Sequence, residues 1–189
     1  LVSHGGDLAV GAYGIGNRLV FIFVMINMGI NQGMQPIAGY NFGAGRHDRV
    51  VGVLRKALVV ATVITTTGFL VGTFLPRPIV TLFAKDSPEL IDMASHALQC
   101  MVMMLPIVGM QIVSTAFFQS IGYAPKGIFL SLARQRIFLV PAIFRLPRLF
   151  SEPLEGLWHA APTADALASV ISVVLLPKQV RAFRAEHTA

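Results

Sequence analysis

The fold of this chain is most constrained by a long apolar segment without charged residues, between Arg18 and Arg46. A helix that crosses a bilayer needs about 20 apolar residues, and this segment is longer than that. It nevertheless contains amide side chains, to which lipid offers no hydrogen bonds. We therefore expect these amides to face other helices or a watery cavity, as they would in a solute pathway. The amides that we expect to do so are Asn27, Gln32, Gln35 and Asn41.

The composition independently indicates a membrane protein. Hydrophobic residues make up 54% of the chain, charged residues 13%, and the mean hydropathy is +0.68. Soluble domains contain about 25% charged residues. The first residues carry no initiator methionine, basic region or small-residue cleavage site, so we predict no signal peptide and expect the chain to begin partway through a longer protein.

The apolar segments predict an all-α polytopic membrane protein of five transmembrane helices. We place these spans at about 8–42, 56–76, 93–122, 127–149 and 159–177, with a tail at 178–189. The first span is longer than the membrane is thick, so either its ends project or it bends at Gly29, Gly33 or Pro36. Pro106 and Gly109 offer a kink to the third span.

Two local features outside the spans suggest further helices. Residues 46–56 are basic and partly apolar, which suggests a short amphipathic helix on the membrane surface. Ser87 precedes Pro88, and this order predicts a helix that Ser87 caps and that begins at Pro88.

The basic residues predict the orientation in the membrane. They are concentrated in the first, third and last connecting segments, which the positive-inside rule assigns to the cytoplasm. The N-terminal edge is then outside and the C-terminus cytoplasmic. The net charge of +6 is divided among these segments. It therefore indicates topology, and nucleic acid is not expected as a partner.

Two ordered motif blocks resemble the multidrug and toxic compound extrusion (MATE) family. Residues 29–45, with their Gln-Pro pair, are similar to the eighth helix of that family. Far downstream, residues 130–135, Pro141 and 146–150, then 156–158 and 161–165, resemble its eleventh and twelfth helices. The resemblance covers the whole chain but only the back half of a twelve-helix pattern. It implies that this chain is helices eight to twelve, most of one of two six-helix lobes.

The resemblance also implies a function. Members of the family export drugs and organic cations in exchange for entering Na⁺ or H⁺, by alternating access. It implies a lipid bilayer and a missing N-terminal lobe as partners, no cofactor, and a bacterial cytoplasmic (inner) membrane as the location. Some branches carry cation-binding carboxylates in helices seven and ten. Residues 93–122, which match helix ten, contain no Asp or Glu, so the coupling ion stays open.

Further candidates for the substrate pathway lie in the first and third spans. Pro36 has no amide hydrogen, so it should bend the first span and leave the carbonyl of Gln32 free to accept a hydrogen bond. Amide side chains of the third span would be costly if they faced lipid. They are Gln99, Gln111 and Gln119.

Three charged residues within the predicted spans are also candidates. Arg18 is either a cavity or gate residue, or it reaches the interface or pairs with a carboxylate such as Asp165 or Asp7. Asp165 either carries a proton or stabilises the first turn of the last helix, which follows Pro162. Arg134 interrupts the fourth span.

The sequence does not predict an enzyme. It has no nucleophile-and-base pair, no phosphate-binding glycine loop and no cluster with metal-ligand spacing. Other functions remain open, namely a lipid-linked oligosaccharide flippase-like relative, a membrane protein with an assembly role, or a transport-inactive truncated remnant. The Gln-Pro pair and the Trp158-x-x-x-Pro162-x-x-Asp165 motif favour the exporter.

Overall fold

The first helix is far longer than a membrane is thick. The computed structural model describes residues 2–84, 87–123, 125, 128–129, 132, 137–149, 159–160, 162–171 and 176–177. Helix α1, Val2–Gly43, departs from helical torsion angles only at Gly6, where φ is 63°. The 38 residues from Gly6 to Gly43 extend over about 57 Å at 1.5 Å per residue. Gly29, Gly33 and Pro36, the positions predicted for a bend, keep helical torsion angles. The length of α1 agrees with the other alternative, in which its ends project beyond the hydrocarbon.

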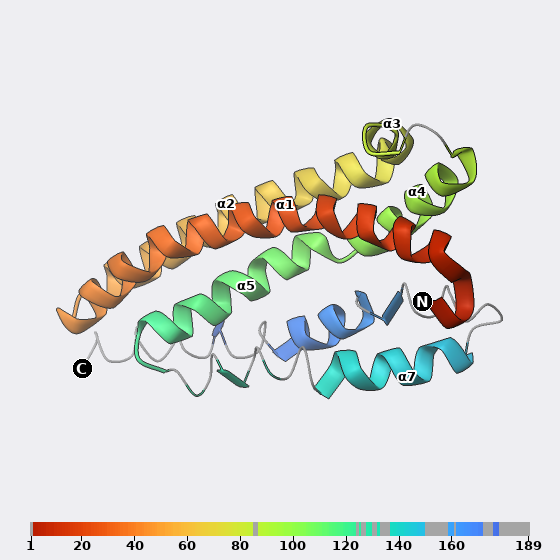
Figure 1. Ribbon diagram of the computed structural model, residues 1–189. Helices are drawn as coiled ribbons and strands as arrows, with labels where there is room; N and C mark the ends of the chain where they lie inside the picture. Colours follow the sequence, from red (N-terminus) through yellow and green to blue (C-terminus); the bar gives the residue numbers. More distant parts are fainter. Residues whose placement is uncertain are drawn as a thin grey trace.

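Helix α2, His47–Phe74, returns alongside α1 after a tight turn (Figure 1). Gly45 in this turn has φ 67°, a conformation that favours glycine. The prediction of a separate surface helix over 46–56 is wrong, because α2 runs through that segment without a break. Val50, Leu54 and Ala57 are buried there, so this turn-proximal part of α2 packs into the core.

Prolines determine where the next three helices begin. Helix α3, Pro76–Thr81, helix α4, Pro88–Val102, and helix α5, Leu105–Ser120, each carry proline at the first or second position. There the missing amide hydrogen costs no helical bond. The prediction for Ser87 is confirmed, since its side chain accepts a hydrogen bond from the amide of Leu90.

The predicted third span is bent. Helices α4 and α5 meet at an angle of 48°, with the break between Val102 and Leu105. Pro106 explains the position, because it cannot donate a hydrogen bond to the carbonyl of Val102. Gly109 has a different role from the expected kink. A Cβ atom added at Gly109 would lie 2.7 Å from both Cγ2 and Oγ1 of Thr65, so the glycine allows α5 to approach α2 closely.

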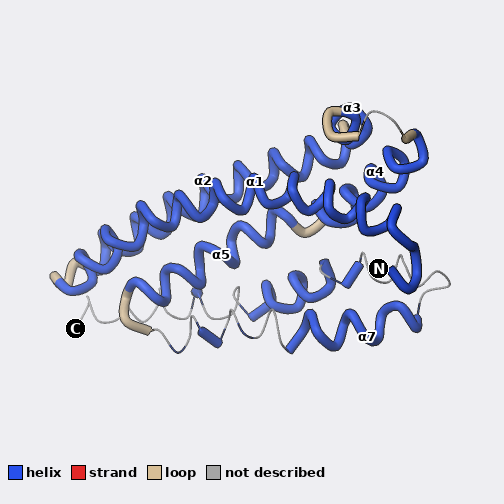
Figure 2. The backbone as a smooth tube through the Cα atoms, viewed as in Figure 1, coloured by secondary structure: helices blue, strands red, loops and turns tan. Residues whose placement is uncertain are grey.

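Every labelled element of the described chain is a helix, as predicted (Figure 2). By length and composition, α1 and α2 can each cross a membrane, and the bent pair of α4 and α5 can form one further span. Helix α7, Val140–Leu149, covers part of the predicted fourth span, and residues 162–171 are helical within the fifth. Most of the remainder of those two spans and the whole tail at 178–189 lie outside the described residues, so five spans stays a prediction.

The core consists of two main apolar clusters at opposite ends of α1. One includes Met34 and Ala38 of α1, packed with residues of α2 and with Phe117 and Phe118 of α5. The other includes Ala12 of α1, Val80 of α3 and residues of α4. Because α1 takes part in both clusters, it fixes the position of α5 at one end and of α4 at the other.

Candidate functional site

A cavity of about 370 Å³ lies between the C-terminal half of α1 and helix α5. Its lining residues recur every three or four positions on each helix, which places them on one face of α1 and one face of α5. They are Met28, Asn31, Gln32 and Gln35 of α1, and Gln111, Ile112, Thr115, Ala116 and Gln119 of α5. None of these nine side chains carries a formal charge.

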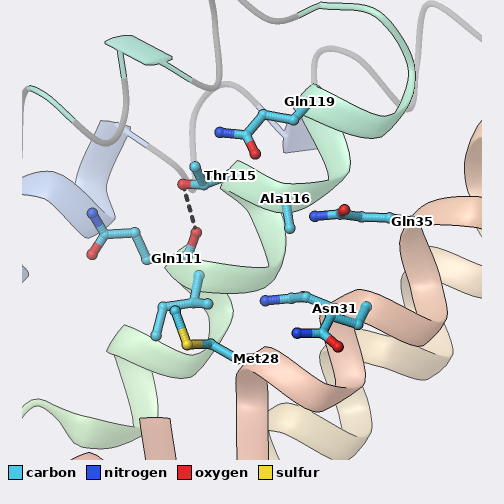
Figure 3. Close-up of a pocket in the computed structure, with 9 residues that line it drawn as sticks. Met28, Asn31, Gln35, Gln111, Thr115, Ala116 and Gln119 are labelled. Carbon is cyan, nitrogen blue, oxygen red and sulfur yellow. Dashed lines mark hydrogen bonds between the residues drawn. The ribbon is translucent and has the colours of Figure 1, made fainter. Parts of the chain in front are cut away.

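Five amide side chains define the polar character of this amide cavity. Gln111 and Asn31 are buried, with 2% and 5% of their surfaces exposed. Gln35 is half-buried, whereas Gln32 and Gln119 are exposed. Figure 3 shows Gln35 extending from α1 toward Ala116 of α5. The amides thus range from exposed at the mouth of the cavity to buried at its base.

The two buried amides keep acceptors that the described chain does not use. Oδ1 of Asn31 and Oε1 of Gln111 are buried and have no hydrogen-bond partner there. Thr115, by contrast, donates from Oγ1 to the backbone carbonyl of Gln111 over 3.0 Å (Figure 3). A buried acceptor without a donor costs about 1–3 kcal/mol. Asn31 and Gln111 each carry such a cost within the described chain.

The proline of the Gln-Pro pair adds a backbone acceptor beside the same cavity. Pro36 lies inside α1 and has no amide hydrogen, so the carbonyl of Gln32 lacks its usual partner four residues later. Since Gln32 and Gln35 both line the cavity, this feature of the sequence does lie at the site.

Other predicted pathway residues lie away from the amide cavity. Asn27 and Asn41 are buried, and each donates from Nδ2 to the carbonyl four residues earlier, at 2.9 Å to Phe23 and 2.8 Å to Ile37. Gln99 lies on α4, where its Nε2 donates to the carbonyl of Thr73 at 3.1 Å. A part for these three in the pathway stays a prediction.

The charged candidates are also separate from the amide cavity. Arg18 is exposed and makes no ion pair within the described part of the chain. Asp165 is buried in the helical segment 162–171, three residues after Pro162, where a carboxylate suits the helix dipole. Arg134 lies outside the described residues. Among those that are described, no group of three or more His, Cys, Asp or Glu could hold a metal ion.

The sequence interpretation missed Asn31 and Thr115. Both were visible in the spacing: 28, 31 and 35 on one helix, and 111, 115 and 119 on the other, each repeat at helical intervals. What could not be read from either helix alone is that these two faces meet.

The fold and the cavity together define a class, a polytopic helical membrane protein with an uncharged, amide-lined cavity inside a helical lobe. The family model MatE matches residues 1–144, and the chain belongs to this family. This membership confirms the sequence-based identification and places the chain among transport proteins rather than enzymes.

Individual relatives agree with this assignment. The multidrug export protein MepA of Staphylococcus aureus (strain MSSA476) is 28% identical over 178 residues, which are 93% of this chain and 38% of that protein. MepA of Staphylococcus saprophyticus is 26% identical over 184 residues, 96% of this chain and 40% of that protein. The chain therefore spans about two fifths of the length of these relatives.

Solved structures confirm the all-α polytopic membrane fold. The MATE multidrug transporter DinF-BH is 34% identical and matches with a TM-score of 0.82 over 97% of this chain and 40% of that one. An inward-facing MATE family transporter matches with a TM-score of 0.87 at 16% identity, over 97% of this chain and 42% of that one. An outward-facing MATE family transporter gives the same TM-score.

Proposed function

We propose that this chain forms most of one lobe of an exporter of drugs and organic cations. The observation that carries this proposal is the amide cavity, whose uncharged lining combines amide groups with apolar side chains. Amide oxygens accept hydrogen bonds from ammonium and amidinium groups, while Met28, Ile112 and Ala116 offer apolar contacts. Because methionine repacks around varied shapes and no fixed charge demands one geometry, such a site suits many organic cations. The names of the MepA relatives support this over a flippase-like relative or an inactive remnant.

The transport cycle we propose is antiport by alternating access. The fold of this lobe is matched equally in inward-facing and outward-facing MATE transporters, which supports a lobe that moves as a unit. A second, N-terminal lobe of the same protein would complete the pathway, as in rocking carriers generally. The coupling ion is Na⁺ or H⁺. Residues 93–122 hold no carboxylate, so its site lies elsewhere, with Asp165 as the buried candidate of this lobe.

Substitution of the Gln-Pro pair tests the site. Gln35→Ala removes a cavity amide, and Pro36→Ala supplies a hydrogen to the free carbonyl of Gln32. In cells that express the complete reading frame, we expect Gln35→Ala to change the order of preference among drugs. Pro36→Ala should slow export of all of them. Drug accumulation is measured at equal membrane abundance, with Na⁺ and pH varied separately to identify the coupling ion.

Thr66→Ala on α2, outside the amide cavity, is the control for both variants. If Gln35→Ala and Pro36→Ala export every drug as Thr66→Ala does, the cavity is not part of the pathway and the proposal fails.

We further propose that the turn between α1 and α2 is cytoplasmic and that the segment after α3 faces outward, in a bacterial cytoplasmic membrane. In a Cys100→Ser background, single cysteines at Ala44 and Leu82 should react from opposite sides with a membrane-impermeant thiol reagent. Both positions are exposed, so burial does not obscure the result. Labelling of both positions from the same side would disprove this orientation. The same result would also contradict the cytoplasmic assignment of the C-terminus.

A further inference from the structure

A second, larger cavity lies at the other end of the lobe, where α2 ends and α3 packs against α4. Its volume is about 660 Å³, and charged and hydrogen-bonding groups contribute much of its lining. The lining residues are Thr73 and Phe74 of α2, Pro76, Arg77 and Pro78 of α3, and Asp92, Ser95, His96 and Gln99 of α4. It shares no residue with the amide cavity.

An open ion pair occupies the mouth of this cavity. Nη2 of Arg77 donates to Oδ1 of Asp92 at 2.7 Å, while the two side chains are 71% and 61% exposed. An ion pair so exposed contributes little to stability. Within the described chain the remaining N–H groups of Arg77 and the second oxygen of Asp92 have no further hydrogen bond. The pair therefore presents a cationic donor and an anionic acceptor side by side.

A buried hydroxyl borders the same cavity. Ser95 is only 6% exposed, and its Oγ has no hydrogen-bond partner in the described chain. The neighbouring Gln99 is already engaged with the carbonyl of Thr73. Ser95 and Gln99 thus make the α4 side of this cavity polar.

The rim of this cavity is apolar and exposed. Phe74, Pro76 and Pro78 are its apolar lining residues, and Phe74, the last residue of α2, is 75% exposed. Helix α2 is long and apolar enough to cross a membrane, so its end at Phe74 lies near the level of the lipid headgroups. In Figure 1, α3 lies across this end of the helices. A polar pocket with an apolar rim at this depth matches an amphiphile, a molecule with a polar headgroup and apolar chains.

We propose that this cavity binds the headgroup of a phospholipid that carries a primary ammonium, phosphatidylethanolamine. Its phosphate accepts hydrogen bonds from the free N–H groups of Arg77. Its ammonium donates to Asp92, and the upper acyl chains lie on Phe74 and Pro78. An anionic headgroup without the ammonium would place its charge beside Asp92, and a choline headgroup has no N–H to donate. The ion pair thus selects the zwitterion, independently of any transported substrate.

The test measures lipid binding to the protein expressed from its complete reading frame. After delipidation in detergent, native mass spectrometry compares retention of phosphatidylethanolamine, phosphatidylcholine and phosphatidylglycerol. We expect about tenfold preference for phosphatidylethanolamine, as two charge-assisted hydrogen bonds permit. Arg77→Gln and Asp92→Asn should each remove the preference. Arg77→Lys, which keeps the charge, should retain part of it even if the neutral variants fold poorly.

Controls distinguish the headgroup site from general adhesion. Arg145→Gln removes an exposed arginine of α7 outside this cavity and should leave the preference unchanged. Water-soluble glycerophosphoethanolamine should not displace the lipid at equal concentration, because it lacks the chains that contact the rim. Equal retention of the three lipids, unchanged preference in both Arg77→Gln and Asp92→Asn, or displacement by the soluble headgroup would each overturn the proposal.

Discussion

Gly109→Ala is expected to destabilise this lobe by about 1–3 kcal/mol, the usual cost of overpacking a core. The added methyl group would meet Cγ2 and Oγ1 of Thr65 at 2.7 Å. Thr65 cannot easily turn away, since Oγ1 donates to the carbonyl of Ala61 at 2.8 Å. In an exposed helix the same substitution would stabilise by up to about 1 kcal/mol. A decrease in stability therefore reports the contact between α2 and α5.

Thermal unfolding of the purified chain measures this effect. Its single cysteine, Cys100, is buried and becomes reactive on unfolding, so a thiol-reactive dye reports the transition. Thr65→Ala combined with Gly109→Ala should recover most of the loss, because it removes both contacting atoms. Gly52→Ala, where a Cβ atom would meet nothing within 4 Å, is the control and should be neutral or stabilising. If Gly109→Ala behaves like Gly52→Ala, close approach at Gly109 does not matter to the fold.

Asn31→Leu and Gln111→Met should change stability and transport in opposite directions. Each removes a buried oxygen that has no partner within the described chain, so each should be neutral or stabilising by about 1 kcal/mol. Each also removes an acceptor from the amide cavity. We expect drug export to fall about tenfold, since a hydrogen bond to a charged donor contributes about 1.5–3 kcal/mol and 1.4 kcal/mol is a factor of ten.

Measuring stability and export together distinguishes an amide that serves transport from an amide that serves packing. Efflux is measured in cells at equal abundance, and stability by the same thiol assay. Thr65→Val is the control, because it alters a buried polar residue whose hydroxyl is already bonded and which lies outside the cavity. Variants that lose stability but keep export would show that the two amides serve the lobe's packing, contrary to the proposed site.

The sequence predicts most of the local structure because local causes determine it. Ser87 and Pro88 determine the start of α4 through one side-chain bond and one missing amide hydrogen. Hydropathy predicts α1 and α2 as spans, since burial in lipid is a property of each helix alone. The surface helix at 46–56 was predicted wrongly for the complementary reason. Basic residues suggested an interface there, whereas Val50 and Leu54 pack into a core shared with α1 and α5.

The sequence predicted the chemistry of the candidate site, but only some of the residues that line it. Charge-free helices rich in amides imply a polar pathway, because lipid cannot satisfy those groups. Four of the predicted amides do line the amide cavity, namely Gln32, Gln35, Gln111 and Gln119. Asn27, Asn41 and Gln99 do not, although their residue types gave the same reason to include them.

By itself, then, the sequence determined that the chain is a helical membrane protein of the MatE family, where its helices are capped, and that amides must find partners within it. The tertiary structure decided which amides meet. That depends on how far α5 is rotated and bent against α1. The break before Leu105 and the close contact of Gly109 with Thr65 set both. Such contacts join residues far apart in the chain, so no periodicity within one helix encodes them.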